Sequence, residues 1–83
     1  MENFLELKLD YENTAYCRTH YKGKFENKNY NIVILHHNNF DEICTATKDG
    51  EPNAPLIKGL RVLLNNKKYI VADRNGYSVL EEM

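Results

Sequence analysis

Apolar residues in this chain recur mostly at every second position, which is the period of a β-strand with one buried face. The pattern is clearest near the start, where Leu5, Leu7 and Leu9 alternate with charged residues. We therefore expect a half-buried strand over residues 4–10, followed by a turn at residues 11–13. The same period continues through most of the chain, so the sequence predicts a mainly β fold.

Turn signals divide the rest of the chain into short strands. The predicted strands span residues 14–22, 30–36, 59–64, 68–73 and 77–80. Residues 30–36 are apolar on both faces at their centre, which is typical of a strand in the middle of a sheet. Asn75-Gly76 is the strongest hairpin signal, because Asn and Gly tolerate the positive φ of tight turns. Gly23 is expected to weaken or bulge the strand that precedes it.

Residues 39–46 fit two structures. Asn39 could cap a short helix in which Phe40, Ile43 and Cys44 fall at helical spacing. The β-branched threonines on either side of Ala46 instead favour a strand. We expect one turn of helix or an irregular bend, followed by a strand.

The length of 83 residues suits a single domain over 1–83, because two smaller pieces could not each bury a core. Leu, Ile, Val and Phe supply 21 residues, enough for the chain to fold. Six or seven short antiparallel strands predict a bent sheet or a small SH3-like or OB-like barrel, since closing a sheet removes exposed edges.

Several locations are disfavoured by the sequence. The acidic start lacks the basic and apolar regions of a secretory signal, and the longest aliphatic run, residues 32–35, is far too short to cross a membrane. Two cysteines are few for a small secreted domain, so we expect Cys17 and Cys44 to be buried free thiols, with one disulfide as the alternative. These features predict a cytoplasmic protein without a membrane partner.

Residues suited to catalysis or metal binding are present but poorly spaced. Cys17 and His20 are three apart on a predicted strand, and His36 and His37 are adjacent, so neither pair converges on a zinc ion. Ser78 lies in a short terminal strand, and no complete glycine elbow surrounds it. No glycine-rich phosphate loop occurs. The sequence therefore predicts a protein that is not an enzyme and holds no metal and no cofactor.

Charge is distributed in blocks although the net charge is −1. Residues 14–36 carry a net charge of +3, whereas residues 1–13 and 37–56 each carry −3. Aromatic residues lie among the cations of the basic block, as in surfaces that bind proteins or single-stranded nucleic acids. In an extended strand the even-numbered residues share the outer face. The predicted contact residues are Tyr16, Arg18, His20, Tyr21, Lys22 and Lys24.

Three functional hypotheses follow. The favoured one is a small non-catalytic protein that binds a host or cellular protein, such as a phage or mobile-element inhibitor that blocks a host defence or nucleic-acid-processing factor. The alternative is a single-stranded RNA- or DNA-binding barrel that uses the Tyr/Arg/Lys face of residues 16–30. A pI near 6.3 favours the protein partner, because dedicated nucleic-acid binders are usually basic. A homo-oligomer paired through strand edges is the third.

Overall fold

The computed structural model describes residues 3–46 and 54–83, which form eight strands and one short 3-10 helix. The strands are β1 (Leu5–Glu6), β2 (Lys8–Asn13), β3 (Arg18–Phe25), β4 (Lys28–His36), β5 (Asp41–Thr45), β6 (Arg61–Leu64), β7 (Lys67–Arg74) and β8 (Tyr77–Glu82), and the helix is η1 (Thr14–Tyr16). The mainly β prediction is confirmed. The sequence predicted six or seven antiparallel strands, whereas the described residues form eight. One pair, β1 with β6, is parallel.

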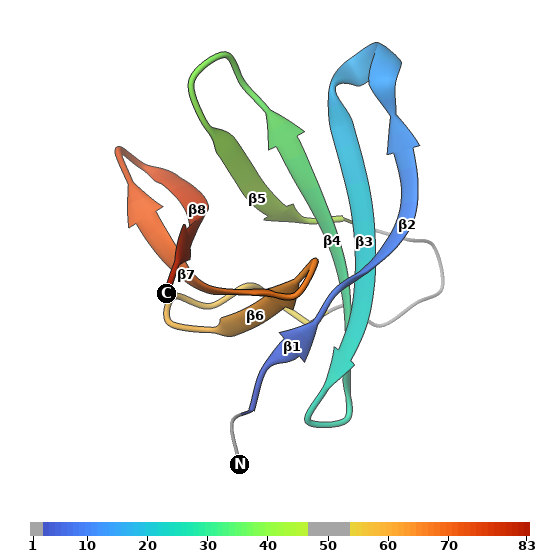
Figure 1. Cartoon of the computed structure of the whole chain (residues 1–83), viewed down its shortest axis with the longest axis vertical. Helices are drawn as coiled ribbons and strands as arrows, with labels where there is room; N and C mark the ends of the chain where they lie inside the picture. Colours follow the sequence, from blue (N-terminus) through green and yellow to red (C-terminus); the bar gives the residue numbers. More distant parts are fainter. Residues whose placement is uncertain (1–2, 47–53) are drawn as a thin grey trace.

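The strands form two four-stranded sheets that pack face to face. One sheet has the order β2-β3-β4-β5 and the other the order β1-β6-β7-β8. The strands of the two sheets cross at a steep angle (Figure 1). β4 lies inside its sheet, as its apolar faces predict, and β6, β7 and β8 form a three-stranded meander. Among the described strands no ladder joins β5 to β8, so the sheets do not close into one continuous barrel.

The first predicted strand is divided between the two sheets. β1 pairs with β6, the chain changes sheet at Leu7, and β2 pairs with β3. The Leu7 amide still donates to the Leu63 carbonyl at 2.9 Å. Leu5 and Leu7 are buried, but Leu9 is 56% exposed because it lies beyond the change of sheet. Strands that change sheet in this way form the corners of steeply crossed sheets.

Gly23 lies where β1 crosses β3, and its role differs from the predicted one. Pairing between β3 and β4 continues without a shift through Gly23 and Tyr30. A Cβ atom at Gly23 would lie 2.4 Å from the Glu6 carbonyl oxygen and 2.9 Å from a methyl carbon of Leu5. The glycine therefore lets the backbone of β1 approach β3. The irregular pairing expected at this position lies instead in β2, between Leu9 and Tyr11.

The second predicted strand begins later than its sequence suggested. β2 continues through the predicted turn to Asn13, and the chain reverses in η1. Cys17 then adopts a left-handed conformation with φ 54°, and its amide donates to the Thr14 carbonyl. β3 starts at Arg18. The reversal removes the predicted inward alternation of Ala15 and Cys17, and both are exposed.

Three hairpins use two-residue turns in which both residues have positive φ. These turns are Glu26–Asn27, Asn65–Asn66 and Asn75–Gly76. Such turns match the twist of antiparallel strands, and Asn and Gly accept them at low cost. The predicted hairpin at Asn75-Gly76 is confirmed. The last strand runs to Glu82, two residues beyond its predicted end, and the Met83 amide donates to the Lys68 carbonyl.

Residues 39–46, for which the sequence allowed a helix or a strand, form β5. A bend at residues 38–39 precedes it. The helical alternative is wrong, because Ile43 pairs with Ile34 and is only 2% exposed. A strand buries this side chain beside its cross-strand neighbour. The two prolines at positions 52 and 55 predict a loop over residues 51–55, and its first three residues lie outside the described part of the chain.

The core lies between the two sheets and draws on both. Its most deeply buried side chains are Leu5, Ile32, Ile43 and Val62. Tyr21, Phe25, Leu56, Tyr69 and Leu80 pack against its margin. None of the described residues forms a helix long and apolar enough to span a membrane.

Replacing Gly23 by Ala tests the crossing of β1 over β3. The new methyl group would overlap the Glu6 carbonyl, so the backbone of β1 must shift. We expect the free energy of unfolding in urea to fall by about 1–3 kcal/mol. Lys24→Ala, an exposed change at the next residue of β3, is the matched control and should alter it by less than about 0.5 kcal/mol. Equal stability of the two variants would contradict the close approach.

Candidate functional site

Cross-strand pairing places the predicted cations of β3 on one face of the β2-β3-β4-β5 sheet. Directly paired residues share a face, and alternate residues along a strand do so as well. His20 pairs with Tyr11 on one side and with Val33 on the other. Lys22 pairs with Lys8 in the same way. We call this surface, with the adjoining ring of Tyr16, the Arg18 face; it comprises Lys8, Tyr11, Tyr16, Arg18, His20, Lys22 and Lys24.

The rings and cations of the Arg18 face contact one another. Tyr11 and His20 stack with their centroids 4.2 Å apart and an interplanar angle of 10°. The Arg18 guanidinium lies 5.7 Å from the centre of the Tyr16 ring, within cation–π range. Tyr11 is 48% exposed and Tyr16 is 70% exposed, so both rings present large apolar surfaces to solvent.

The electrostatic balance of the Arg18 face is positive. Lys8, Arg18, Lys22 and Lys24 are all exposed. Asp10 lies at the irregular point of β2, and its carboxylate is 3.9 Å from the Lys22 ammonium group. The Asp10 side chain is only 20% exposed, whereas that of Lys22 is 60% exposed. The face therefore presents cations more prominently than carboxylates.

Five of the six predicted contact residues lie on the Arg18 face. Tyr21 does not, and two residues of the face, Lys8 and Tyr11, were not predicted. Tyr21 lies on the opposite face of β3, where it packs against the core. Burial raises the pKa of its phenol, and the carboxylates of Glu12 and Asp41 add to the rise. Lys8 and Tyr11 were missed, because the turn predicted at residues 11–13 hid the pairing of β2 with β3. A turn predicted after Asn13 instead would have kept both residues in a strand paired with β3.

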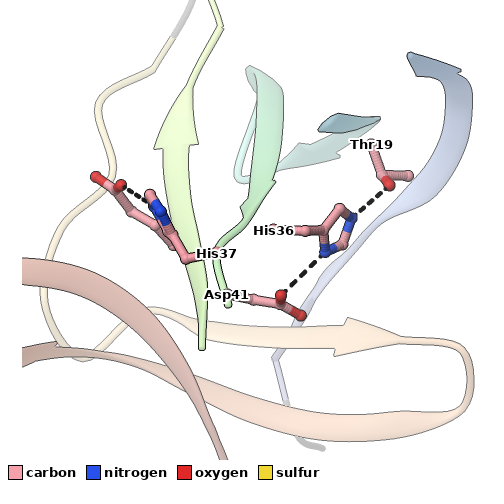
Figure 2. A network of polar contacts seen from close by, with 5 residues as sticks. Thr19, His36, His37 and Asp41 are labelled. Atoms are coloured by element: carbon pink, nitrogen blue, oxygen red, sulfur yellow. Dashed lines mark hydrogen bonds and ion pairs between the residues drawn. The ribbon is translucent and has the colours of Figure 1, made fainter. Parts of the chain in front are cut away.

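The inner face of the same sheet carries a hydrogen-bonded network where β3, β4 and β5 meet (Figure 2). His36 Nδ1 lies 2.9 Å from an oxygen of Asp41, and His36 Nε2 lies 2.8 Å from the Thr19 hydroxyl. A carboxylate only accepts hydrogen bonds, so Nδ1 carries a proton. In the neutral ring Nε2 then accepts from Thr19. One imidazole thus joins three neighbouring strands.

A second histidine contact extends this end of the sheet. His37 Nε2 donates to Glu42 at 2.9 Å, and the Cys44 thiol donates to the other oxygen of Glu42 at 3.5 Å. The His37 ring stacks on Phe40 with centroids 4.6 Å apart, and Phe40 meets Tyr77 of β8 at 5.0 Å. These contacts link the β4–β5 turn to the edge of the other sheet.

The order of carboxylate, imidazole and hydroxyl in Asp41, His36 and Thr19 matches that of nucleophilic triads. A nucleophile must reach a substrate carbonyl, however, and Thr19 is only 8% exposed. We therefore assign the network a structural role, which is to clamp the ends of β3, β4 and β5 together. No sequence motif signals this network, because its three residues come from three different strands.

The cysteines differ from each other in environment, and both are free. Cys17 is exposed at the left-handed end of η1, and Cys44 is partly buried, so the expectation that both thiols are buried is wrong. Burial raises the pKa of the Cys44 thiol, and its hydrogen bond to Glu42 and the charge of Glu42 raise it further. Within residues 3–46 and 54–83, no three His, Cys, Asp or Glu side chains gather as a metal site.

Comparison of the chain with protein-family models, with curated proteins and with solved structures found no match.

The two thiols should differ in their rate of alkylation. Thiolate is the reactive form, and a raised pKa lowers its fraction at about pH 8. We expect iodoacetamide to modify Cys17 before Cys44, as followed by peptide mass spectrometry. Glu42→Gln removes the neighbouring charge and should accelerate only Cys44. Equal rates for the two thiols, or a faster Cys44, would contradict the environments described here.

Proposed function

We propose that this chain is a non-catalytic binding protein that docks on a partner protein through the Arg18 face. The observation that carries the proposal is the exposure of Tyr11 and Tyr16 beside Arg18 on one broad sheet surface. Tyr and Arg side chains dominate the binding energy of many protein interfaces, and a Tyr ring buries a large area for only two rotatable bonds. The paired strands hold these side chains at fixed spacing, which lowers the entropy lost on binding.

The charge of the Arg18 face supports a partner with an acidic surface. Its four cations share the surface with the two exposed rings, so a complementary patch would be rich in Asp or Glu and would also offer apolar pockets. By binding such a patch, the protein would block the partner sterically, and no chemical reaction is required. We place the protein among cytoplasmic phage or mobile-element inhibitors of host defence or nucleic-acid-processing factors. This placement rests on the 83-residue size and the Asn-rich, Gly-poor composition of the sequence.

The second candidate is a single-stranded nucleic acid bound on the same face. Exposed rings beside lysines can stack bases and neutralise phosphates. The nearly balanced charge of the chain disfavours this candidate, because phosphate contacts dominate nucleic-acid affinity. Asp10, beside Lys22, also places a carboxylate where a phosphate would lie.

Substitution of the two side chains in cation–π contact tests the protein partner. The tagged chain is used to capture its partner from host extract, and the affinity for the purified partner is then measured. Tyr16→Ala combined with Arg18→Ala should cost about 2 kcal/mol or more, about a thirtyfold loss. Arg61→Ala, at an exposed arginine of β6, is the matched control and should bind like the wild type. Undiminished binding by the double variant, with its urea unfolding unchanged, would remove the Arg18 face from the interface.

Fluorescence anisotropy with short single-stranded oligonucleotides separates the two candidates. A protein-directed face should give no measurable binding at low salt. Binding that falls steeply with added salt, and is lost in the Tyr16→Ala and Arg18→Ala double variant, would instead establish the nucleic-acid candidate.

A further inference from the structure

The outer face of the β2-β3-β4-β5 sheet holds a depression beside the first residue of β2. β3 and β4 pair with each other as far as Phe25 and Lys28, whereas β2 begins only opposite Lys22 (Figure 1). The ends of β3 and β4 therefore extend beyond β2, at the place where the chain arrives from β1. A depression of about 580 Å³ opens here.

Two rows of polar side chains line this depression. Lys8, Lys22 and Asn31 form one row across β2, β3 and β4, because each is paired with the next. Lys24 and Asn29 are paired one alternation further along β3 and β4, so they form a second row on the same face. The depression thus brings together three ammonium groups and two carboxamides from three strands.

The floor of the depression is backbone. Gly23 and Tyr30 pair with each other between the two rows, and both line the depression. The Tyr30 side chain packs in the core on the opposite face, and Gly23 has no side chain. A group that enters the depression therefore reaches the backbone of β3 and β4 beside the polar side chains of both rows.

The ammonium groups here outnumber the carboxylates that could neutralise them. Lys8 and Lys22 are directly paired, and like charges in such positions destabilise a sheet. Asp10, which is not part of the lining, lies 3.9 Å from the Lys22 ammonium group. Among the described residues, no carboxylate lies within 4.0 Å of the ammonium groups of Lys8 and Lys24, not even that of Glu6, which also lines the depression. Two cations thus remain without an ion pair there.

Two such cations match an anion of charge −2. A phosphate monoester carries nearly two negative charges at about pH 7 and offers three acceptor oxygens. A carboxylate would offset only one of the two ammonium groups and offers two oxygens. Asn29 is exposed, and its carboxamide can donate a further hydrogen bond.

We propose that this depression binds a phosphorylated serine or threonine side chain of the partner protein. The inference rests on the proposed function, because Lys8, Lys22 and Lys24 form one end of the Arg18 face. A single phosphoryl group needs only the depression, whereas the successive phosphates of a nucleic acid that followed the face would meet Asp10. Phosphorylation of the partner would therefore strengthen its capture, since it adds the charge that these lysines lack.

A nuclear magnetic resonance titration tests the depression without the partner. The probe is a short peptide with phosphoserine between glycines, compared at constant ionic strength with the same peptide carrying serine or glutamate. We expect the phosphopeptide to shift the backbone amide signals of Gly23, Lys24 and Tyr30. The glutamate peptide should bind about tenfold more weakly, and the serine peptide should not bind. Equal binding of the phosphoserine and glutamate peptides, or shifts confined to other parts of the chain, would overturn the proposal.

Neutral variants test the two lysines that lack an ion pair. Lys8→Gln combined with Lys24→Gln should weaken phosphopeptide binding by about tenfold or more. Lys28→Gln combined with Lys67→Gln is the matched control, since it changes the net charge equally at two exposed lysines outside the lining. An unaltered affinity in the first double variant, with its urea unfolding unchanged, would contradict the site. So would an equal loss in both double variants, because the attraction would then be unspecific.

Removal of phosphate from the partner separates this inference from the proposed function. The captured partner is treated with a phosphatase, and its affinity should fall by about tenfold or more. An undiminished affinity would overturn the inference alone, since the Arg18 face can still bind the unmodified protein. Tighter binding of inorganic phosphate or of a single-stranded oligonucleotide than of the phosphopeptide would also overturn it, because the depression would then serve a free anion or a nucleic acid. Failure of the proposed function appears instead in a Tyr16→Ala and Arg18→Ala variant that keeps its partner.

Discussion

The close passage of β1 over β3 at Gly23 is the constraint on which the two-sheet structure depends. Residues 5–9 are shared between the sheets, because β1 adds to β6 and β2 adds to β3 without an intervening loop. A side chain at position 23 would push the Glu6 backbone away and open the core where Leu5 is completely buried. One missing Cβ atom thus allows a small chain to bury a core between two crossed sheets.

This arrangement also explains why a depression opens on the outer face. The crossing brings the chain into the β2-β3-β4-β5 sheet only at Lys8, so β3 and β4 extend beyond β2 and the depression lies there. The outer face of the β2-β3-β4-β5 sheet points away from the core and carries the cations and rings of the Arg18 face. The His36 network ties β3, β4 and β5 together at the far end of that sheet. A rigid sheet keeps exposed binding side chains at fixed spacing.

The position of the cations on one face could be predicted although the start of the strand was not. Side chains alternate with a period of two, so Arg18, His20, Lys22 and Lys24 share a face wherever the strand begins. Tyr21 belongs to the other face by the same rule, and it packs against the core. Lys8 and Tyr11 join the face only because β2 pairs with β3 in a particular register. That register depends on a turn whose left-handed residue, Cys17, is not a usual turn former.

Local sequence patterns were enough to predict the mainly β fold, the interior place of β4 and the hairpin at Asn75-Gly76. These follow from alternation and from residues that accept positive φ, which are properties of a few neighbouring positions. Long-range packing sets three further features: residues 4–10 divide between two sheets, Gly23 allows one strand to cross another, and Thr19, His36 and Asp41 meet. The same holds for the depression beside the start of β2. Each of these depends on which distant strands approach one another, and the free energy of that approach comes from burying the whole core.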